Sequence, residues 1–305
     1  MDCSKNHLNA FQFLRLLFFV VWQQRQRYLL RASALFFKSF NCSFVIFKAY
    51  ESKLFLHSQK LISNIGMQLF FIDDLSNTEI VLSEEESKHC IRVLRKKIGD
   101  EIILIDGKGT EAIATIVDDN PKRCKLHIKL RNEKRETRNY NLHIAIAPTK
   151  NFERMDWFIE KAVELGINEI TFIESENSER TKINLERCQK IAIAAIKQSK
   201  QFYLPKLNEV IKLTKFMELT KLNTKEELRL IAFCDEKTNS LTQQITQSHN
   251  QNFSILIGPE GDFTSKEIEL AKSAGFKTVS LGSTILRTET AGVFVCAALK
   301  TLLEK

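Results

Sequence analysis

The sequence contains no long hydrophobic run. Its most apolar stretch, FLRLLFFVVW at residues 13–22, is interrupted by Arg15. It is also about half as long as a helix must be to cross a bilayer. We therefore expect no transmembrane helix and no membrane partner.

The sequence also lacks the paired cysteines of a zinc site. It has no C-x-x-C pair and no histidine near a cysteine at metal-binding spacing, which argues against bound metal and against a Cys–His nucleophile. Dispersed thiols, odd in number, are typical of a reduced cytoplasmic protein. The apolar neighbours of Cys234 and Cys296 predict core packing for these two. The seven cysteines are Cys3, Cys42, Cys90, Cys124, Cys188, Cys234 and Cys296.

Over most of the chain, the sequence has almost no excess of positive charge. The formal net charge of the whole chain is +8, but residues 1–66 hold nine Lys or Arg and only two acids. Residues 67–305 hold 36 basic and 35 acidic side chains. A nucleic-acid site in this larger part must therefore be a local basic patch.

Residues 1–66 have no proline, one glycine and ten of the 22 phenylalanines. A signal peptide is one interpretation, but its A-x-A-like site at 32–34 follows a polar segment. An organellar transit peptide is a second interpretation. The third, which we favour, is that these residues are an extension outside the functional protein, which begins at Met67.

Residues 67–131 have short β-branched runs separated by turn signals such as Gly99-Asp100 and Asp106-Gly107. Close spacing of this kind predicts a small antiparallel β-barrel. A single helix is expected over 83–96, where Ser83 and Glu86 have the spacing of a capping box. The polar segment 132–141 is predicted to be a linker.

From Leu142, strands alternate with helices. Strands are expected in 142–147, 169–174, 228–234, 253–258 and 278–281, and helices over 151–165, 184–200 and 265–275. A final helix is expected to contain the apolar segment VFVCAALKTLL (293–303). This alternation predicts an α/β domain with a parallel sheet over 142–305. The helix at 151–165 carries an apolar stripe that is expected to face the core.

Two glycine-containing turns directly follow strands of this sheet: LIGPEGDFT (256–264) and LGSTILRTETAG (281–292). Ligands in open α/β sheets bind at the carboxyl ends of the strands. Neither turn is a phosphate-binding loop, and no G-x-G-x-x-G follows the first strand, which excludes a nicotinamide dehydrogenase. Loops with exposed backbone and few cations favour a neutral or cationic cofactor.

Further segments accompany these turns: HCIRVLR (89–95), KNFERMDWFIEKAVELG (150–166), SER (178–180) and AIKQS (195–199). With them, the chain from Met67 closely resembles the bacterial 16S ribosomal RNA (uridine-N3) methyltransferase family of the SPOUT class. Three departures from the usual family pattern are Asp262 for glycine, Thr284 for arginine, and the stretch KQSKQ at 197–201.

The resemblance implies a PUA-like RNA-binding barrel, a trefoil-knotted α/β domain that binds S-adenosyl-L-methionine, a homodimer, and methylation of one uridine of the small ribosomal subunit. The alternative from another functional class is a non-catalytic RNA-binding assembly factor that retains the fold. The intact turns argue against it.

Site residues follow from the motifs. N3 of uridine is a poor nucleophile until its proton leaves, so the reaction needs a base or a cation that stabilises the anion. Arg287 is the candidate cation, and Glu289 is either the base or the group that orients Arg287. We also expect Thr288 or Thr290 to cap the last helix.

The resemblance and the motifs also give candidate binding residues. The candidate cofactor residues are Ile257, Gly258, Pro259, Glu260, Gly261, Leu281, Gly282, Ile285, Leu286, Arg287 and Thr290. The candidate RNA-binding residues are His89, Arg92, Arg95, Lys150, Arg180, Gln198 and Lys200.

Overall fold

The computed structural model describes residues 68–134, 138–222, 226–233 and 239–304. Residues 67–305 form one compact unit. The expectations for residues 1–66 and for Cys234 lie outside the described residues.

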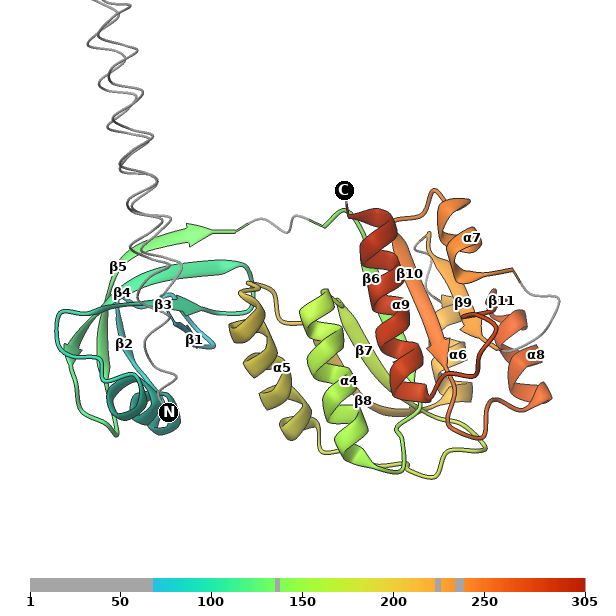
Figure 1. Cartoon of the computed structure of the whole chain (residues 1–305), viewed down its shortest axis with the longest axis horizontal. Coiled ribbons are helices and arrows are strands. Elements are labelled where there is room, and N and C mark those ends of the chain that lie inside the picture. The colour runs from blue at the N-terminus through green and yellow to red at the C-terminus, as the bar shows by residue number, and fades with distance from the viewer. Residues whose placement is uncertain (1–67, 135–137, 223–225, 234–238, 305) are drawn as a thin grey trace, which may run out of the picture. The chain divides into compact units, whose positions relative to one another are not determined.

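The first sheet has five strands in the order β1-β3-β4-β5-β2 (Figure 1). The strands are β1 (Leu69–Phe71), β2 (Glu79–Val81), β3 (Glu101–Ile105), β4 (Thr110–Asp118) and β5 (Lys125–Glu133). β4 pairs antiparallel with β3 and β5, and β5 pairs antiparallel with β2, as predicted. β1 instead pairs parallel with β3, so the barrel is a mixed sheet. β5 also includes Asn132 and Glu133, which the sequence had placed in the linker.

The helix expected over 83–96 is shorter and irregular. α3 covers Glu84–Lys88 and continues as a π-helical turn, η1, over His89–Val93. The hydroxyl of Ser83 accepts a hydrogen bond from Glu86 N at 3.3 Å. The carboxylate of Glu86 is bonded to Lys197 Nζ, so the second half of the predicted capping box is wrong.

The second sheet has six parallel strands in the order β11-β9-β10-β6-β7-β8, which confirms the predicted α/β class. The strands are β6 (Asn141–Ile146), β7 (Glu169–Glu174), β8 (Lys206–Lys212), β9 (Leu228–Ala232), β10 (Asn252–Ile257) and β11 (Lys277–Val279). β8 was not predicted, because this edge strand, KLNEVIK, lacks an apolar run.

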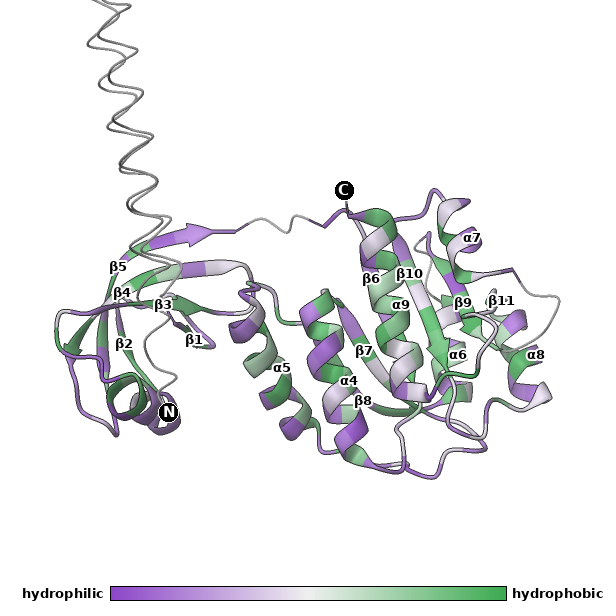
Figure 2. Ribbon diagram, in the orientation of Figure 1, coloured by the Kyte–Doolittle hydropathy of each residue, from purple (hydrophilic) through white to green (hydrophobic). Residues whose placement is uncertain are grey.

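The helices cover both faces of the second sheet. α4 (Phe152–Leu165), α5 (Leu185–Ser199), α7 (Leu241–Thr246) and α9 (Thr288–Leu303) share one apolar core with the sheet. α6 (Leu213–Leu222) and α8 (Ser265–Ser273) share another, on the opposite face (Figure 1). Figure 2 shows the apolar character of β10, which lies between these two helical layers. Of these helices, α6 and α7 were not predicted.

The stripe on α4 faces the core as expected, with Met155, Phe158, Ile159, Ala162 and Val163 buried. Asn151 accepts a hydrogen bond from Glu153 N at the start of the helix, and Gly166 ends it at a φ of 94°. This φ belongs to the left-handed region, which favours glycine. α4 is therefore fixed at both ends and along its buried face.

The barrel is joined to the α/β domain through backbone contacts at the β3–β4 turn. Gly109 N donates to Phe202 O at 3.0 Å, and Leu204 N donates to Gly107 O at 2.8 Å. A Cβ atom at Gly109 would lie 2.4 Å from the hydroxyl of Tyr203. Glycine at this position therefore permits the close contact between the turn and residues 202–204.

Candidate functional site

A pocket of about 270 Å³ lies at the carboxyl ends of β9, β10 and β11. Its walls come from the 258–262 turn after β10, from residues 280–287 after β11, and from the first turn of α9. The size is close to the lower end of the range for small-molecule sites, about 300 Å³. Both turns singled out in the sequence therefore line one pocket.

One side-chain hydrogen bond joins the two turns. Thr288 Oγ1 donates to the carbonyl oxygen of Gly258 at 3.0 Å, and Thr288 is buried. The expectation that Thr288 or Thr290 caps α9 is wrong. The N-cap residue is Arg287, which makes no side-chain capping bond. The Thr288 hydroxyl does not cap the helix, because it donates to the neighbouring turn instead.

Most of the eleven candidate cofactor residues line the pocket. Gly261 and Thr290 do not: the carbonyl of Gly261 accepts a hydrogen bond from Asn177 Nδ2, and Thr290 is exposed on α9. The residues that line it are Ile257, Gly258, Pro259, Glu260, Leu281, Gly282, Ile285, Leu286 and Arg287. Seven further residues line the pocket and were not predicted as cofactor-binding: Ala232, Phe233, Asp262, Ser280, Thr284, Thr288 and Ala291. Ala232 and Phe233 could have been identified from the sequence, because they lie near the carboxyl end of the predicted strand 228–234, where ligands bind.

The second turn presents an unpaired backbone to the pocket. No hydrogen bond to residues 284–286 occurs among the described residues, and Ile285 is 92% exposed. Gly282 has a φ of 135°, and a Cβ there would meet nothing within 4 Å. Free N–H and C=O groups beside an exposed apolar side chain suit a ligand with both an apolar body and hydrogen-bonding edges.

Asp262, a departure from the family pattern, also lines the pocket. It adopts a φ of 59°, and its Oδ1 accepts a hydrogen bond from Phe263 N at 2.7 Å. Aspartate tolerates the left-handed region better than most residues, since its short side chain can bond to the local backbone. Burial raises the pKa of this carboxyl.

Arg287 and Glu289 occupy different environments. Arg287 is exposed, whereas the side chain of Glu289 is only 8% exposed. No hydrogen bond or ion pair joins them in the described part of the chain. The option that Glu289 orients Arg287 therefore finds no contact to support it. The cation beside Glu289 is Arg154 on α4, whose Nε lies 3.9 Å from Glu289 Oε1 and which the sequence analysis missed.

Four of the candidate RNA-binding residues line a second cavity, a groove of about 740 Å³ between η1 and the C-terminal end of α5. They are His89, Arg92, Gln198 and Lys200. Lys88 and Lys197 line it as well, but Lys197 is paired with Glu86. Arg95 does not line it and lies beyond the end of η1, with a φ of 55°. The prediction that Arg92 and Arg95 share a helical face is therefore wrong.

Lys150 and Arg180 form a separate cluster at the start of α4. Lys150 Nζ lies 2.9 Å from Glu179 Oε2, and Arg180 Nη2 donates to Lys150 O at 2.9 Å. The guanidinium of Arg180 also lies over the ring of Phe152, 5.6 Å from its centre. The structure thus divides the candidate RNA-binding residues between two places.

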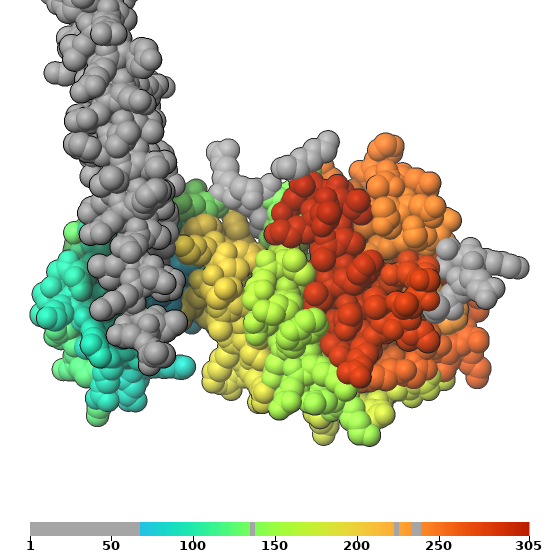
Figure 3. Space-filling view, viewed as in Figure 1, coloured from blue at the N-terminus to red at the C-terminus, as the bar shows by residue number. Residues whose placement is uncertain are grey.

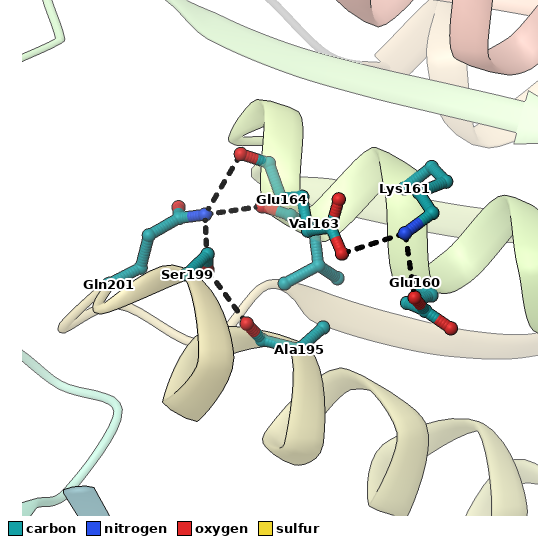
Figure 4. A network of polar contacts seen from close by, with 7 residues as sticks. All are labelled: Glu160, Lys161, Val163, Glu164, Ala195, Ser199 and Gln201. Carbon is teal, nitrogen blue, oxygen red and sulfur yellow. Dashed lines mark hydrogen bonds and ion pairs between the residues drawn. The ribbon is translucent and has the colours of Figure 1, made fainter. Parts of the chain in front are cut away.

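Gln201, within the departure at 197–201, connects two helix ends. The side-chain amide of Gln201 donates to the carbonyls of Val163 and Glu164 at the end of α4, at 2.6 and 3.2 Å, and to Ser199 Oγ at 3.0 Å (Figure 4). Carbonyls at a helix C-terminus lack partners within the helix. Gln201 therefore joins the ends of α4 and α5.

Among the residues that the structure describes, no helix is long and apolar enough to span a membrane. Within the same ranges, no group of three or more His, Cys, Asp or Glu side chains is arranged to hold a metal ion.

Comparisons with known proteins agree with this fold. A family model described as RNA methyltransferase domain matches residues 136–300, and one described as RNA methyltransferase PUA domain matches residues 82–129. The ribosomal RNA small subunit methyltransferase E of Rickettsia conorii is 31% identical over 229 residues, which cover 74% of this chain and 91% of that protein.

Solved structures extend the similarity. A probable rRNA-methyltransferase from Porphyromonas gingivalis has a TM-score of 0.71 and 39% identity, over 78% of this chain and 98% of that one. The ribosomal RNA small subunit methyltransferase E of Neisseria gonorrhoeae, bound to S-adenosyl methionine, has a TM-score of 0.68 and 28% identity, over 77% and 98%. This chain therefore belongs to the RNA methyltransferase family, among the ribosomal RNA small subunit methyltransferases E.

Proposed function

We propose that this protein uses S-adenosyl-L-methionine to methylate N3 of a uridine in the 16S RNA of the small ribosomal subunit. The observation that carries the proposal is the pocket formed by the two turns at 258–262 and 280–287, joined by the Thr288–Gly258 hydrogen bond. Family membership supports the reaction class, and N3 of uridine as the target atom is what the resemblance to the uridine-N3 methyltransferases implies.

The pocket fits the proposed cofactor in its chemistry. Free backbone groups at 284–286 can bond to the edge of an adenine, and Ile285 and Leu286 can cover its apolar face. The carboxylates of Glu260 and Asp262 are the anionic groups that line the pocket, which suits a cationic ligand. The cofactor supplies a methyl group on a positively charged sulfur, which becomes a neutral thioether when the methyl leaves.

Arg287 and Glu289 have complementary roles in the proposal. Glu289 takes the proton from N3, and the electron pair left on the ring forms the new N–CH₃ bond. Arg287 donates hydrogen bonds to the carbonyl oxygens beside N3, where the negative charge develops. Its exposure at the rim of the pocket leaves the guanidinium accessible to RNA.

The groove between η1 and α5, lined by His89, Arg92, Gln198 and Lys200, is the proposed RNA-binding surface. Its cationic side chains can contact phosphates, which position an RNA without reading its sequence. Lys150 and Arg180 are proposed as a second contact near the start of α4. Ribosomal RNA as substrate is also our reason for proposing a cytoplasmic location.

We further propose a homodimer that uses the outer face of α4 and α9. Figure 3 shows these helices side by side at the surface of the molecule. Trp157 on α4 is 43% exposed and Phe294 on α9 is 42% exposed, and large aromatic side chains of this kind are enriched at protein interfaces. Light scattering on the wild type and on Trp157→Glu tests it. A monomeric wild type would contradict the proposal.

The test of the reaction uses the full chain with small subunits that lack the modification. Calorimetry measures cofactor binding, and transfer of labelled methyl is followed in single turnover. Primer extension then locates the product, because a methyl group at N3 blocks base pairing. Cofactor binding and RNA binding without methyl transfer would favour the alternative, a non-catalytic assembly factor. A methyl group found at another atom would refute the assignment to N3.

A further inference from the structure

Arg154 lies between two carboxylates that come from different parts of the pocket. Its Nη1 is 3.9 Å from Glu260 Oε1, in the turn after β10. Its Nε is 3.9 Å from Glu289 Oε1, in the first turn of α9. These contacts are longer than hydrogen bonds, and the side chain is 36% exposed, so much of the donor capacity of the guanidinium stays open.

Glu289 is a buried acid with one free oxygen. Its Oε2 is inaccessible to solvent and has no hydrogen-bond partner among the described residues. A buried carboxylate without a nearby cation is strongly unfavourable. In the described part of the chain, Arg154 is the ion-pair partner of Glu289, and the helix N-terminus adds a further favourable term.

The distance between the two side chains is set by the packing of α4 on α9. A Cβ atom at Gly292 would lie 2.4 Å from Cε2 of Phe158, so the two helices are in close contact there. Phe158 is one turn after Arg154 on α4, and Gly292 is three residues after Glu289 on α9. The buried stripe of α4 and the absence of a side chain at Gly292 therefore hold Arg154 beside Glu289.

We infer that Arg154 is a positioning residue for methyl transfer, one that holds the side chain of Glu289 in place at the start of α9. The inference rests on the proposed function. In the step concerned, the N3–H bond breaks, the proton goes to the carboxylate of Glu289, and the electron pair stays on the ring. Arg154 contacts neither the proton nor the ring and acts through Glu289, while its contact with Glu260 connects it to the turn after β10.

Two double-variant comparisons on the full chain test this inference. The first measures the unfolding free energy of the ligand-free protein in urea, for wild type, Arg154→Gln, Glu289→Gln and the double variant. If Arg154 stabilises a buried carboxylate, Arg154→Gln destabilises the wild type but has little effect beside Glu289→Gln. Lys161→Gln is the matched control, since Lys161 lies on the same helix and pairs with Glu160 and Glu164 (Figure 4).

The second comparison measures the single-turnover rate of methyl transfer at saturating RNA and cofactor. We expect Arg154→Gln to lower the rate by about ten- to a hundredfold, less than the largest losses seen on removal of a general base. Cofactor affinity should change little, Arg154→Lys should recover part of the rate, and Arg154→Gln should cause no further loss beside Glu289→Gln.

Each outcome has a distinct meaning. Independent effects on stability would overturn the pairing, whatever the protein does to RNA. If the two substitutions have coupled effects on stability but independent effects on the methyl-transfer rate, the positioning role is overturned. Arg154 would then contact the substrate itself. A wild type that binds the cofactor but transfers no methyl to small subunits would refute the proposed function, and the role of Arg154 with it.

Discussion

At the residue scale, the first two residues of the segment RTET have separate tasks. Arg287 is exposed at the rim of the pocket and occupies the N-cap position of α9 without a side-chain capping bond, whereas Thr288 is buried and bonded to Gly258. The side chain of Arg287 has no hydrogen bond or ion pair to another described residue. It is therefore available to the acceptor base without first breaking an internal contact.

Replacing Arg287 tests its proposed role. Arg287→Ala should lower the methyl-transfer rate by at least two orders of magnitude, about 3 kcal/mol, as removal of an oxyanion donor does. Cofactor affinity should change far less, because backbone groups of the two turns supply much of the binding. Arg287→Lys should rescue poorly, since an ammonium cannot present two parallel donors. A near-normal single-turnover rate at saturating RNA would leave Arg287 as an RNA clamp only.

The same chemistry gives Glu289 a pH signature. If Glu289 is the base, hydroxide should partly replace it, so Glu289→Gln should regain activity as the pH rises. Single-turnover rates across alkaline pH provide the measurement. A loss that is the same at every pH would mean that Glu289 has another role. The charged groups around Glu289 are Arg154, which lies 3.9 Å from it, and Glu260, which lies 3.9 Å from the same arginine. Arg287 precedes Glu289 in the chain.

His143 on β6 makes folding stability depend on pH. Burial lowers its pKa below the usual 6.5, and its Nε2 lies 2.8 Å from Thr171 Oγ1. The folded protein then binds fewer protons than the unfolded chain, so stability falls as the pH drops through about 6.5. His143→Asn should lose less stability than the wild type between about pH 7.5 and pH 5.5 in urea unfolding. Exposed His249 is the control; equal losses in wild type and His143→Asn would contradict the assignment.

At the scale of elements, the end of η1 changes the expectation for the basic segment. One continuous helix would have placed Arg92 and Arg95 on the same face. Because the helical run ends after η1 and Arg95 adopts a φ of 55°, only Arg92 lines the groove with His89 and Lys200.

The two arginines should therefore differ in RNA binding. Arg92→Ala should weaken binding and lower the slope of log K against log salt concentration by about one, since each phosphate contact contributes roughly that much. Arg95→Ala, the matched control, should have a smaller effect, and neither should change cofactor affinity. Equal effects on RNA would contradict the groove, and a loss of cofactor affinity would indicate that η1 is structural.

At the scale of the whole molecule, residues 67–305 contain the cores of both sheets and form a compact unit. The family relatives align with 73–77% of this chain but with most of their own length, up to 99%. We propose that residues 1–66 add nothing to fold or activity. The knotted path implied for the α/β domain also stays a prediction.

Shortening the chain tests the role of the first residues. A chain that begins at Met67 should match the full chain in unfolding free energy and in single-turnover rate, because the folded cores and the pocket lie within 67–305. A rate more than about tenfold lower, equivalent to about 1.4 kcal/mol in the barrier, would show that the first 66 residues contribute to activity.

The sequence by itself determined the features that depend on neighbouring residues. Alternation of strands and helices predicted the parallel sheet, and the stripe from Met155 to Val163 predicted the buried face of α4. The turns after β10 and β11 were recognisable because each glycine directly follows a buried strand, and parallel strands bring their carboxyl ends to one edge. The edge strand β8 escaped prediction because a strand exposed on one side needs no apolar run.

Tertiary structure decided what joins distant segments. Nothing local in FERMD marks Arg154 as the partner of Glu289, because the pair exists only where α4 packs against α9 at Gly292. The groove between η1 and α5 likewise depends on how the barrel contacts the α/β domain. The Thr288 hydroxyl, expected as a cap, instead bonds to Gly258 because the turn after β10 lies within reach. Sequence patterns identify groups with the right chemistry, but the distances that pair them are set by packing between elements far apart in the chain.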